Sequence, residues 1–229
     1  MSHYIIIGAS SGIGFQLAKS LTEKGHNIHA LSRNKAELET LSNCQFHEID
    51  ITMENPNFPI FEGPLDGLIY CPGSINLKPF RALKTEDFLN EYQINFLGAV
   101  KSIKQYLPNL QLGESPSIVL FSTVAVQTGM SFHASIASAK GAIEGLTRSL
   151  AAEFAPKIRV NAIAPSLTAT PLSEKLINNE TKLKASEERH PLKKIGATSD
   201  ISNAVEFLLS ANWMTGQIIH LDGGMSAIR

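Results

Sequence analysis

The sequence predicts an α/β fold in which a doubly wound, mostly parallel seven-stranded sheet carries helices on both faces. Short apolar runs alternate with longer segments of helical periodicity, the pattern of successive βαβ units. Glycines and other turn residues separate these segments. The length of 229 residues suits one large domain of this class better than two small ones. We therefore expect a single domain over residues 1–229.

The first βαβ unit lies at the N-terminus. Tyr4–Ile7 is predicted to be a strand, and a helix is predicted over Gly12–Lys24 because apolar residues recur there on one helical face. Gly25 ends this helix, and Ile28–Leu31 forms the second strand.

The other elements are brief β-favouring runs beside turn residues and helical segments between them. The further strands are predicted at Gln45–Ile49, Leu68–Cys71, Ser117–Phe121, Arg159–Ala162 and Gln217–Leu221. The further helices are predicted at Lys35–Leu41, Thr85–Leu107, Ala134–Phe154 and Ser199–Leu208.

Pro171–Ile195 interrupts this alternation, because it is long, polar and charged and has no strand pattern. A segment of that length in a compact domain is usually a lid over a site or a disordered loop. A solvated helix explains the composition equally well, so both alternatives stay open.

The composition is that of a soluble globular protein. Hydrophobic residues make up 43% of the chain, and 20 Lys and Arg nearly balance 21 Asp and Glu. This balance gives no sign of a nucleic-acid partner. The apolar run before Gly8 is too short for a signal peptide or membrane span. Cys44 and Cys71 match neither a disulfide framework nor a metal site, so we expect a cytoplasmic protein without a metal.

A glycine-rich turn, "GASSGIG", follows the first strand and opens the first helix. Gly8, Gly12 and Gly14 permit a tight turn and a close backbone approach, and the free N–H groups at a helix N-terminus favour an anion. Strand-to-helix turns often contain glycine for structural reasons alone. At the first βα junction, however, this spacing favours a pyrophosphate site of dinucleotide binding.

The end of the second strand indicates which dinucleotide binds. A carboxylate at this point would hydrogen-bond the ribose hydroxyls of NAD and repel a 2′-phosphate. The sequence instead has neutral Ser32 and cationic Arg33, whose guanidinium suits a phosphate. NADP(H) is therefore the expected cofactor, and an arginine that merely faces solvent is the alternative.

These features resemble the short-chain dehydrogenase/reductase family over nearly the whole chain. The matching motifs, in order, are "GASSGIG", "EIDI", "YCPG", "QINFLGA", "VLFSTVA", "ASIASAKGAIEGLTRSLAAEFAP", "RVNAIAPSLTATPL" and "TGQIIHLDGG". The resemblance implies a Rossmann-type sheet that binds NAD or NADP and hydride transfer to or from the carbonyl carbon of a small-molecule substrate. It also implies a homodimer or homotetramer.

The resemblance also implies roles for individual residues. Asn95 resembles the asparagine that helps to order the family's proton-relay water, Thr123 aligns with its serine, and Lys140 resembles the lysine that holds the nicotinamide ribose. The cofactor-binding residues implied are Gly8, Ser10, Ser11, Gly12, Ile13, Gly14, Ser32, Arg33, Asp50, Ile51, Gly73, Lys140, Pro165, Thr168 and Thr170.

The sequence departs from the family pattern at several positions. Cys71 and Pro72 replace the first two residues of the family's "NAG" turn, and Ser166 replaces a glycine. The family's tyrosine acid lies four residues before the lysine, where this chain has Ile136. Positions i and i+4 lie on one helical face, so residue 136 should project beside Lys140, but isoleucine transfers no proton.

Other residues are poor replacements for that acid. His133 lies seven residues before Lys140. That is about 10 Å along a helix, too far unless the segment bends, and an ordinary helix-entrance histidine is the better interpretation. Tyr92 cannot be placed in the site from the sequence, and Tyr4, Tyr70 and Tyr106 are expected to be structural.

Two functions remain open. The first is an NADP(H)-dependent oxidoreductase with an altered site, in which Thr123 polarises the substrate oxygen and water or His133 supplies the proton. The second is a non-catalytic NADP(H)-binding protein that acts as a sensor or assembly partner, which Ile136 favours. A scaffold that binds no cofactor is a third possibility, which tight NADPH binding would exclude.

Overall fold

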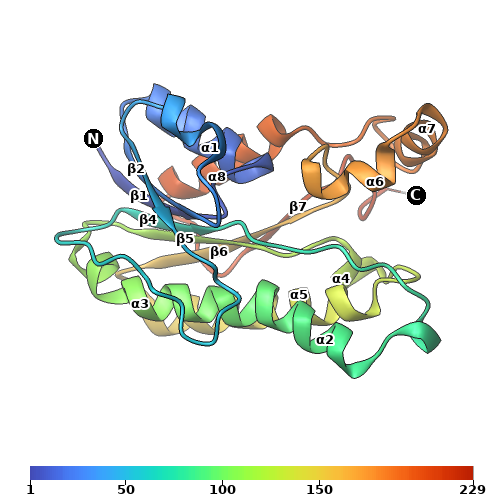
Figure 1. Ribbon diagram of the computed structural model, residues 1–229, viewed down its shortest axis with the longest axis horizontal. Coiled ribbons are helices and arrows are strands. Elements are labelled where there is room, and N and C mark those ends of the chain that lie inside the picture. Colours follow the sequence, from blue (N-terminus) through green and yellow to red (C-terminus); the bar gives the residue numbers. More distant parts are fainter. Residues whose placement is uncertain (229) are drawn as a thin grey trace.

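The computed structural model describes residues 1–228 and confirms the predicted fold class (Figure 1). Seven parallel strands form one sheet in the order β3-β2-β1-β4-β5-β6-β7. The strands are β1 (His3–Ile7), β2 (Asn27–Ser32), β3 (Cys44–Glu48), β4 (Gly67–Tyr70), β5 (Ser117–Phe121), β6 (Arg159–Pro165) and β7 (Ile218–Leu221). The α-helices are α1 (Gly12–Glu23), α2 (Thr85–Tyr92), α3 (Gly98–Leu112), α4 (Ala125–Thr128), α5 (Ala134–Phe154), α6 (Glu174–Ile177), α7 (Glu180–Glu188) and α8 (Thr198–Ser210).

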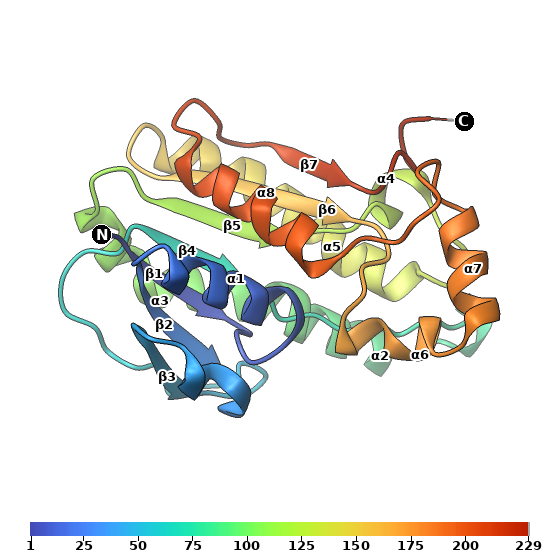
Figure 2. The same ribbon diagram turned by 90° about the horizontal axis from the view of Figure 1, so that it is seen from above.

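The helices cover both faces of the sheet. Helices α1 and α8 lie on one face, and α2, α3 and α5 lie on the other (Figures 1 and 2). Both faces of the central strands are therefore buried, which explains why Ile5, Ile6 and Ile7 are each at most 1% exposed and follow one another without alternation. The strand order reverses between β1 and β4, and a crevice is expected at the carboxyl ends of strands at such a reversal.

The seven predicted strands are confirmed within a few residues, but two predicted helices differ. Lys35–Leu41 was too short for an α-helix and instead contains the 3-10 helix Ala36–Thr40. Thr85–Leu107 is interrupted by a π-helical turn, Gln93–Leu97, that separates α2 from α3. A wider turn of this kind inserts a residue into the helical ladder, which hydrophobic periodicity alone does not reveal.

Pro171–Ile195 contains helices, as the solvated-helix alternative expected, rather than an irregular loop. It contains the 3-10 helix Pro171–Ser173 followed by α6 and α7, of which α7 begins with an Asn179 cap on the Lys182 amide at 2.9 Å. The segment lies at the carboxyl ends of the strands (Figure 2). A bridge between Thr168 and Gly196 brings its two ends together. Its role as a lid stays a prediction.

His190 links this segment by a hydrogen bond to Ser166, directly after β6. Its ring is 1% exposed, Nδ1 lies 2.8 Å from the carbonyl oxygen of Ser186, and Nε2 lies 2.9 Å from Ser166 Oγ. If Nδ1 donates to the carbonyl, Nε2 accepts from the Ser166 hydroxyl. Ser166 thus gives the end of β6 a side-chain contact that the glycine usual at this position would lack.

Gly98 lets α3 begin close to the sheet. A Cβ at this position would overlap the Tyr70 hydroxyl, which donates to the carbonyl oxygen of Ile94 at 2.6 Å, and would lie 3.0 Å from Ile51 Cγ1. The missing side chain therefore sets how closely the π-helical turn and β4 approach each other.

Gly98→Ala should lower the free energy of unfolding by about 1–3 kcal/mol, because the added methyl group overpacks a filled interface. Adding Tyr70→Phe to this variant should restore part of the loss, because it removes the overlapping oxygen. The control is Gly145→Ala in α5, where a Cβ meets nothing within 4 Å. Chemical denaturation measures all three, and equal stabilities of the Gly98 and Gly145 variants would contradict the prediction.

Histidines His29 and His47 lie side by side on β2 and β3 and share contacts with Phe61. The two rings approach to 3.4 Å between Nδ1 and Nε2, and the His29 ring lies 4.1 Å from that of Phe61. Burial, together with the neighbouring His47 and His3, lowers the pKa of His29 from 6.5 to about 4. Burial also lowers the pKa of His47.

Acid should therefore destabilise the fold through this pair. The unfolded chain takes up a proton near pH 6.5 and folded His29 only near 4. The stabilisation that neutral His29 contributes to the free energy of unfolding should thus be fully present above pH 6.5 and should be lost as the pH falls from 6.5 towards 4. Allowing for partial exposure, we expect a loss of about 1–2 kcal/mol at pH 5. Urea denaturation at pH 7.5 and 5 should show a smaller loss for His29→Phe than for wild type or His133→Phe.

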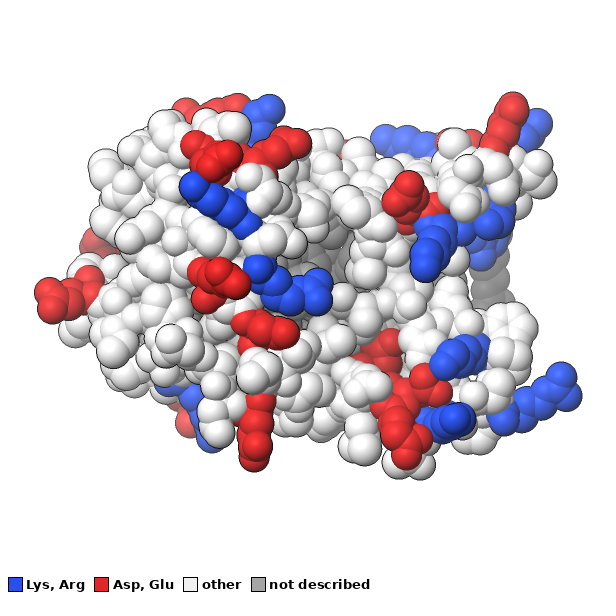
Figure 3. All heavy atoms as spheres, viewed as in Figure 1, with Lys and Arg blue, Asp and Glu red and all other residues white. Residues whose placement is uncertain are grey.

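Two classes of feature do not occur in residues 1–228. No helix there has both the length and the apolar character needed to cross a membrane. The same residues hold no group of three or more His, Cys, Asp or Glu side chains arranged to bind a metal ion. Acidic and basic side chains are interspersed over the face shown in Figure 3.

Candidate active site

A cavity of about 520 Å³ opens at the carboxyl ends of the central strands, where the strand order reverses. Its walls come from the glycine-rich turn, the ends of β2, β3 and β4, and the start of the 171–195 segment. The predicted cofactor residues in its lining are Gly8, Ser10, Ser11, Gly12, Ile13, Gly14, Ser32, Arg33, Asp50, Ile51, Gly73 and Thr170.

The glycine-rich turn forms one end of this cavity. Gly8 and Gly12 have positive φ angles of 79° and 55°, a conformation that other residues rarely adopt. A Cβ on Gly14 would overlap the carbonyl oxygen of Gly8 and lie 3.1 Å from Ala9 Cα, so helix α1 begins directly against β1. The unpaired N–H groups of its first turn therefore border the cavity and can bind an anion.

The rim beside β2 and β3 carries one cation and one anion. Arg33 is exposed, and the Ser32 hydroxyl donates to the carbonyl oxygen of Asn34 at 2.7 Å. Hydrogen bonds from the Thr52 side chain and amide lower the pKa of Asp50, and the charge of Arg33 lowers it further. Asp50 is thus an ionised acceptor, and the Arg33 guanidinium extends from a rim of otherwise neutral residues at β2.

The inner end of the cavity lies at Gly73. A Cβ there would be 3.4 Å from Asn95 Oδ1 and 3.8 Å from Lys140 Nζ, so both groups lie directly behind this glycine. Lys140 is buried, which lowers its pKa to about 8, although Glu91 and Cys71 act in the opposite direction. Asn95 Oδ1 is buried and has no hydrogen-bond partner among the described residues.

The cavity therefore suits a dinucleotide. It combines a helix N-terminus for phosphate, an exposed guanidinium at the rim, a carboxylate beside it and a cradle at Gly73 that a side chain would fill. The unpaired Asn95 oxygen and the Lys140 ammonium border the same cradle and can accept and donate hydrogen bonds.

Comparison with known proteins agrees with this geometry. A family model described as enoyl-(acyl carrier protein) reductase matches residues 8–226. A short-chain type dehydrogenase/reductase from Mycobacterium ulcerans, 27% identical, superposes with a TM-score of 0.89 over 100% of this chain and 90% of the other. The chain belongs to the short-chain dehydrogenase/reductase family.

Relatives of the chain within the short-chain dehydrogenase/reductase family cover almost all of it. A tropinone reductase homolog of Arabidopsis thaliana is 31% identical over 97% of this chain and 92% of its own length. L-xylulose reductase of Bos taurus is 31% identical over 97% of this chain and 96% of its own length. A solved structure of ElxO with NADP bound is 28% identical, with a TM-score of 0.88 over 98% of this chain and 99% of that chain.

Some residues predicted from the short-chain dehydrogenase/reductase motifs lie outside the cavity lining. Pro165 ends β6, where its carbonyl oxygen accepts from the Val124 amide at 3.2 Å. Thr168 is buried, and its hydroxyl donates to the carbonyl oxygen of Ser166 at 3.2 Å. Pro165 is the last residue of β6 and Thr168 lies in the loop that follows it, of which only the later part, from Thr170 to Leu172, borders the cavity.

Sequence reasoning missed several neutral residues of the lining. They follow the strand ends or adjoin predicted residues, so the boundaries of the parallel strands were the available signal. They are Ile7, Leu31, Asn34, Ala36, Ile49, Thr52, Cys71, Pro72, Ile94, Pro171 and Leu172. Cys71 is half-buried, and desolvation raises the pKa of its thiol to about 12 and makes it a poor nucleophile.

The two hydroxyls after β5 have different environments. Ser122 is buried and donates to Glu144 Oε1 at 2.8 Å. Thr123 Oγ1 accepts from the Ala125 amide at 3.4 Å, which uses a lone pair and leaves the O–H as a donor. Of the two, Thr123 is better able to polarise a carbonyl oxygen.

The residues weighed as replacements for the missing tyrosine acid form hydrogen bonds with backbone carbonyl oxygens instead. Ile136 and Lys140 lie one turn apart on α5 and are both buried. His133 precedes α5 and has its Nδ1 2.8 Å from the carbonyl oxygen of Ser131. Tyr70 and Tyr106 bond to backbone carbonyls in the core, as expected of structural tyrosines.

Proposed function

We propose that the chain is an NADP(H)-dependent oxidoreductase that acts on a carbonyl or alcohol substrate and has an atypical active site, with Ile136 where relatives carry a tyrosine acid. One observation carries the proposal. A single cavity extends from the glycine-rich turn past Arg33 to Gly73, behind which lie Asn95 and Lys140. When bound, the cofactor would supply or accept a hydride.

The proposed roles of the chain's own residues are those that the family motifs imply. The first turn of α1 binds the pyrophosphate, and Arg33 binds the 2′-phosphate. Thr123 donates a hydrogen bond to the substrate oxygen, and Lys140 binds the nicotinamide ribose. Asn95 helps to order a proton-relay water. The other proposed cofactor contacts lie at the ends of β2 and β6, after β3 and β4, and in the loop after β6, and they are Ser32, Pro165, Asp50, Ile51, Gly73, Thr168 and Thr170.

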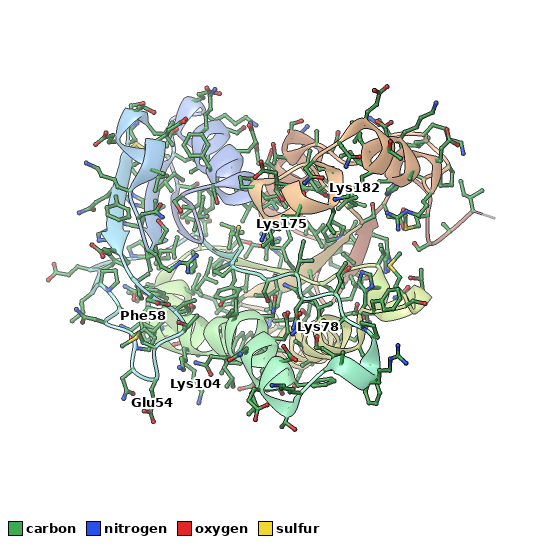
Figure 4. The ribbon with its side chains drawn as sticks, turned by 45° about the vertical axis from the view of Figure 1, so that its right-hand side comes forward. Glu54, Phe58, Lys78, Lys104, Lys175 and Lys182 are labelled. Atoms are coloured by element: carbon green, nitrogen blue, oxygen red, sulfur yellow. The ribbon has the colours of Figure 1, made fainter. Side chains whose placement is uncertain are left out.

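The proposal extends to the substrate side and to the assembly. The 171–195 segment would cover a small-molecule substrate, and Figure 4 shows Lys175 and Lys182 on this segment and Lys78 on the opposite side, ahead of α2. A homodimer or homotetramer in the cytoplasm, with the whole chain acting as one domain, is proposed from the family resemblance.

A screen of carbonyl and alcohol substrates with NADPH or NADP⁺ tests the oxidoreductase proposal. We expect turnover that requires the cofactor and is lost in Lys140→Ala. Turnover that is unchanged in Lys140→Ala would contradict the proposed site. Calorimetric titration with NADPH separates the outcomes, because failure to bind would exclude any cofactor role.

A second function is favoured by Ile136 itself. Because isoleucine cannot transfer a proton, the chain could retain the cofactor without the chemistry and act as an NADP(H)-dependent sensor or assembly partner. Tight NADPH binding without turnover of any substrate would favour this function. Robust turnover by the unmodified protein would exclude it.

Arg33→Ala should weaken NADPH binding about 10- to 100-fold and leave NADH binding nearly unchanged, because one or two charge-assisted hydrogen bonds to the 2′-phosphate are lost. Arg81→Ala, at an exposed position away from the cavity lining, is the matched control. Isothermal titration with both cofactors measures the change. An equal loss for NADH and NADPH would contradict a 2′-phosphate contact.

A further inference from the structure

A buried carboxyl group lies behind the inner end of the cavity. Glu91 of α2 is 2% exposed, and its Oε2 accepts hydrogen bonds from the Ser74 hydroxyl and, at 2.8 Å, from Asn95 Nδ2. Asn95 Nδ2 also donates to Ser74 Oγ at 2.8 Å. These three side chains form a closed network, and Glu91 forms no ion pair of 4.0 Å or less within residues 1–228.

A second carboxyl group one helical turn earlier shows that the position of Glu91 is unusual. Asp87 receives hydrogen bonds from Asn76, Lys78 and the Lys84 amide, which lower its pKa to about 2. Burial instead raises the pKa of Glu91, although the hydrogen bonds and Lys140 oppose the rise and Asp87 adds to it. The pKa values of two carboxyl groups on one helix are thus shifted in opposite directions, as in sites that pair an acid with a fixed charge.

Ser74 is the member of this network that follows a cavity-lining residue in the chain. It follows Gly73, which lines the cavity, and it is partly exposed, whereas Glu91, Asn95 and Lys140 are buried. Lys140 faces the network from α5, beside Gly73. When Glu91 is protonated, its bond with Ser74 reverses, so that the carboxylic O–H donates to Ser74 Oγ and the Ser74 hydroxyl proton is free to be donated elsewhere.

We propose that Glu91 holds a proton for the reaction and delivers it through the Ser74 hydroxyl to the substrate oxygen, replacing the acid that Ile136 removes. This inference rests on the proposed oxidoreductase function. Glu91 acts through Ser74 and is thus a positioning and proton-storing residue rather than one that touches the substrate.

The proton transfer balances in the direction of carbonyl reduction. The O–H bond of the Glu91 carboxyl group breaks, and Ser74 Oγ takes this proton as it gives its own to the substrate oxygen. The hydride that reduces the carbonyl carbon comes from the proposed cofactor. Glu91 is left as a carboxylate that accepts from Ser74 and lies near the Lys140 ammonium, and solvent later returns the proton.

Glu91→Gln and Ser74→Ala test the inference in the intact protein. Glutamine keeps an oxygen that can accept from Asn95, so it preserves the shape of the network but cannot release a carboxylic proton. We expect each variant to lower kcat about 10²-fold or more, with NADPH affinity unchanged. The double variant should have about the same kcat as the single variants, because both residues act in one proton path. Glu86→Gln, exposed on the same helix, is the control.

Two further readouts distinguish proton storage from a structural role. Infrared spectra of the protein with ¹³C-labelled glutamate, without cofactor, should contain a carboxylic-acid C=O band at neutral pH that is lost in Glu91→Gln and kept in Glu86→Gln. In wild type, kcat should fall as the pH rises through the raised pKa of Glu91, and this alkaline limb should be absent in Glu91→Gln.

The outcomes separate this inference from the proposed function. Turnover that is insensitive to Glu91→Gln, or absence of the infrared band, would overturn only the role of Glu91. NADPH binding without any turnover would overturn the oxidoreductase function and this inference with it. Glu91→Gln should lower kcat less in the Ile136→Tyr background than in wild type, because a second acid is then present.

Discussion

Ile136→Tyr should raise the rate of NADPH-dependent carbonyl reduction by about 10²- to 10⁴-fold, which is the usual contribution of a positioned general acid. Residue 136 lies one turn before Lys140 on α5, and the Lys140 ammonium would favour the ionised phenol and so lower the pKa of the new hydroxyl. The phenol would then be poised to give its proton to the substrate oxygen.

The matched control is Ile136→Phe, which adds the ring without the hydroxyl. Because Ile136 is only 6% exposed, both variants must displace neighbouring atoms, and their melting temperatures should fall together. Single-turnover measurements with saturating NADPH then isolate the chemical step. A similar rate in the two variants would show that the hydroxyl at position 136 does not act as the acid.

Gly14→Ala should abolish measurable NADPH binding, with a loss of affinity of at least about 10²-fold, because several charge-assisted hydrogen bonds to the pyrophosphate depend on one turn. The added Cβ would overlap the carbonyl oxygen of Gly8 and lie 3.0 Å from its carbonyl carbon. Helix α1 must therefore move away from β1, and the free energy of unfolding should fall by about 1–3 kcal/mol.

Gly141→Ala provides the comparison for this variant, because a Cβ there meets only Val126 Cγ1 at 3.9 Å. Calorimetric titration measures the affinity and chemical denaturation the stability. Wild-type affinity in Gly14→Ala would contradict the assignment of the glycine-rich turn to phosphate binding.

The sequence was sufficient for the sheet and for most of the predicted residues that line the cavity. Parallel strands covered on both faces become uninterrupted apolar runs such as Ile5–Ile7, and the spacing of Gly8 and Gly14 directly after the first strand is typical of a phosphate-binding turn. These features are local in the chain, so a single sequence reveals them.

The buried polar network could not be predicted in the same way. Glu91 lies in a helix of mixed polarity, where a glutamate is usually solvated. Its burial depends on Ser74, 17 residues earlier, and its proximity to Lys140 depends on the packing of α2 against α5. The π-helical turn that holds Asn95 also has no periodic signal. Contacts between distant segments, rather than composition, create this part of the site.

The bridge between Thr168 and Gly196 has a consequence for how the protein can diversify. The 27 residues between them leave the sheet and return at almost the same point, so the length and sequence of the exposed part around α6 and α7 can change while Thr170–Leu172 and His190 keep their contacts with the cavity and β6. Loop-closure entropy changes slowly with length, and insertions or exchanges here cost little provided that the two ends still meet. New substrate preferences can therefore arise by changes in α6 and α7, while the glycine-rich turn and the residues behind Gly73 stay unchanged.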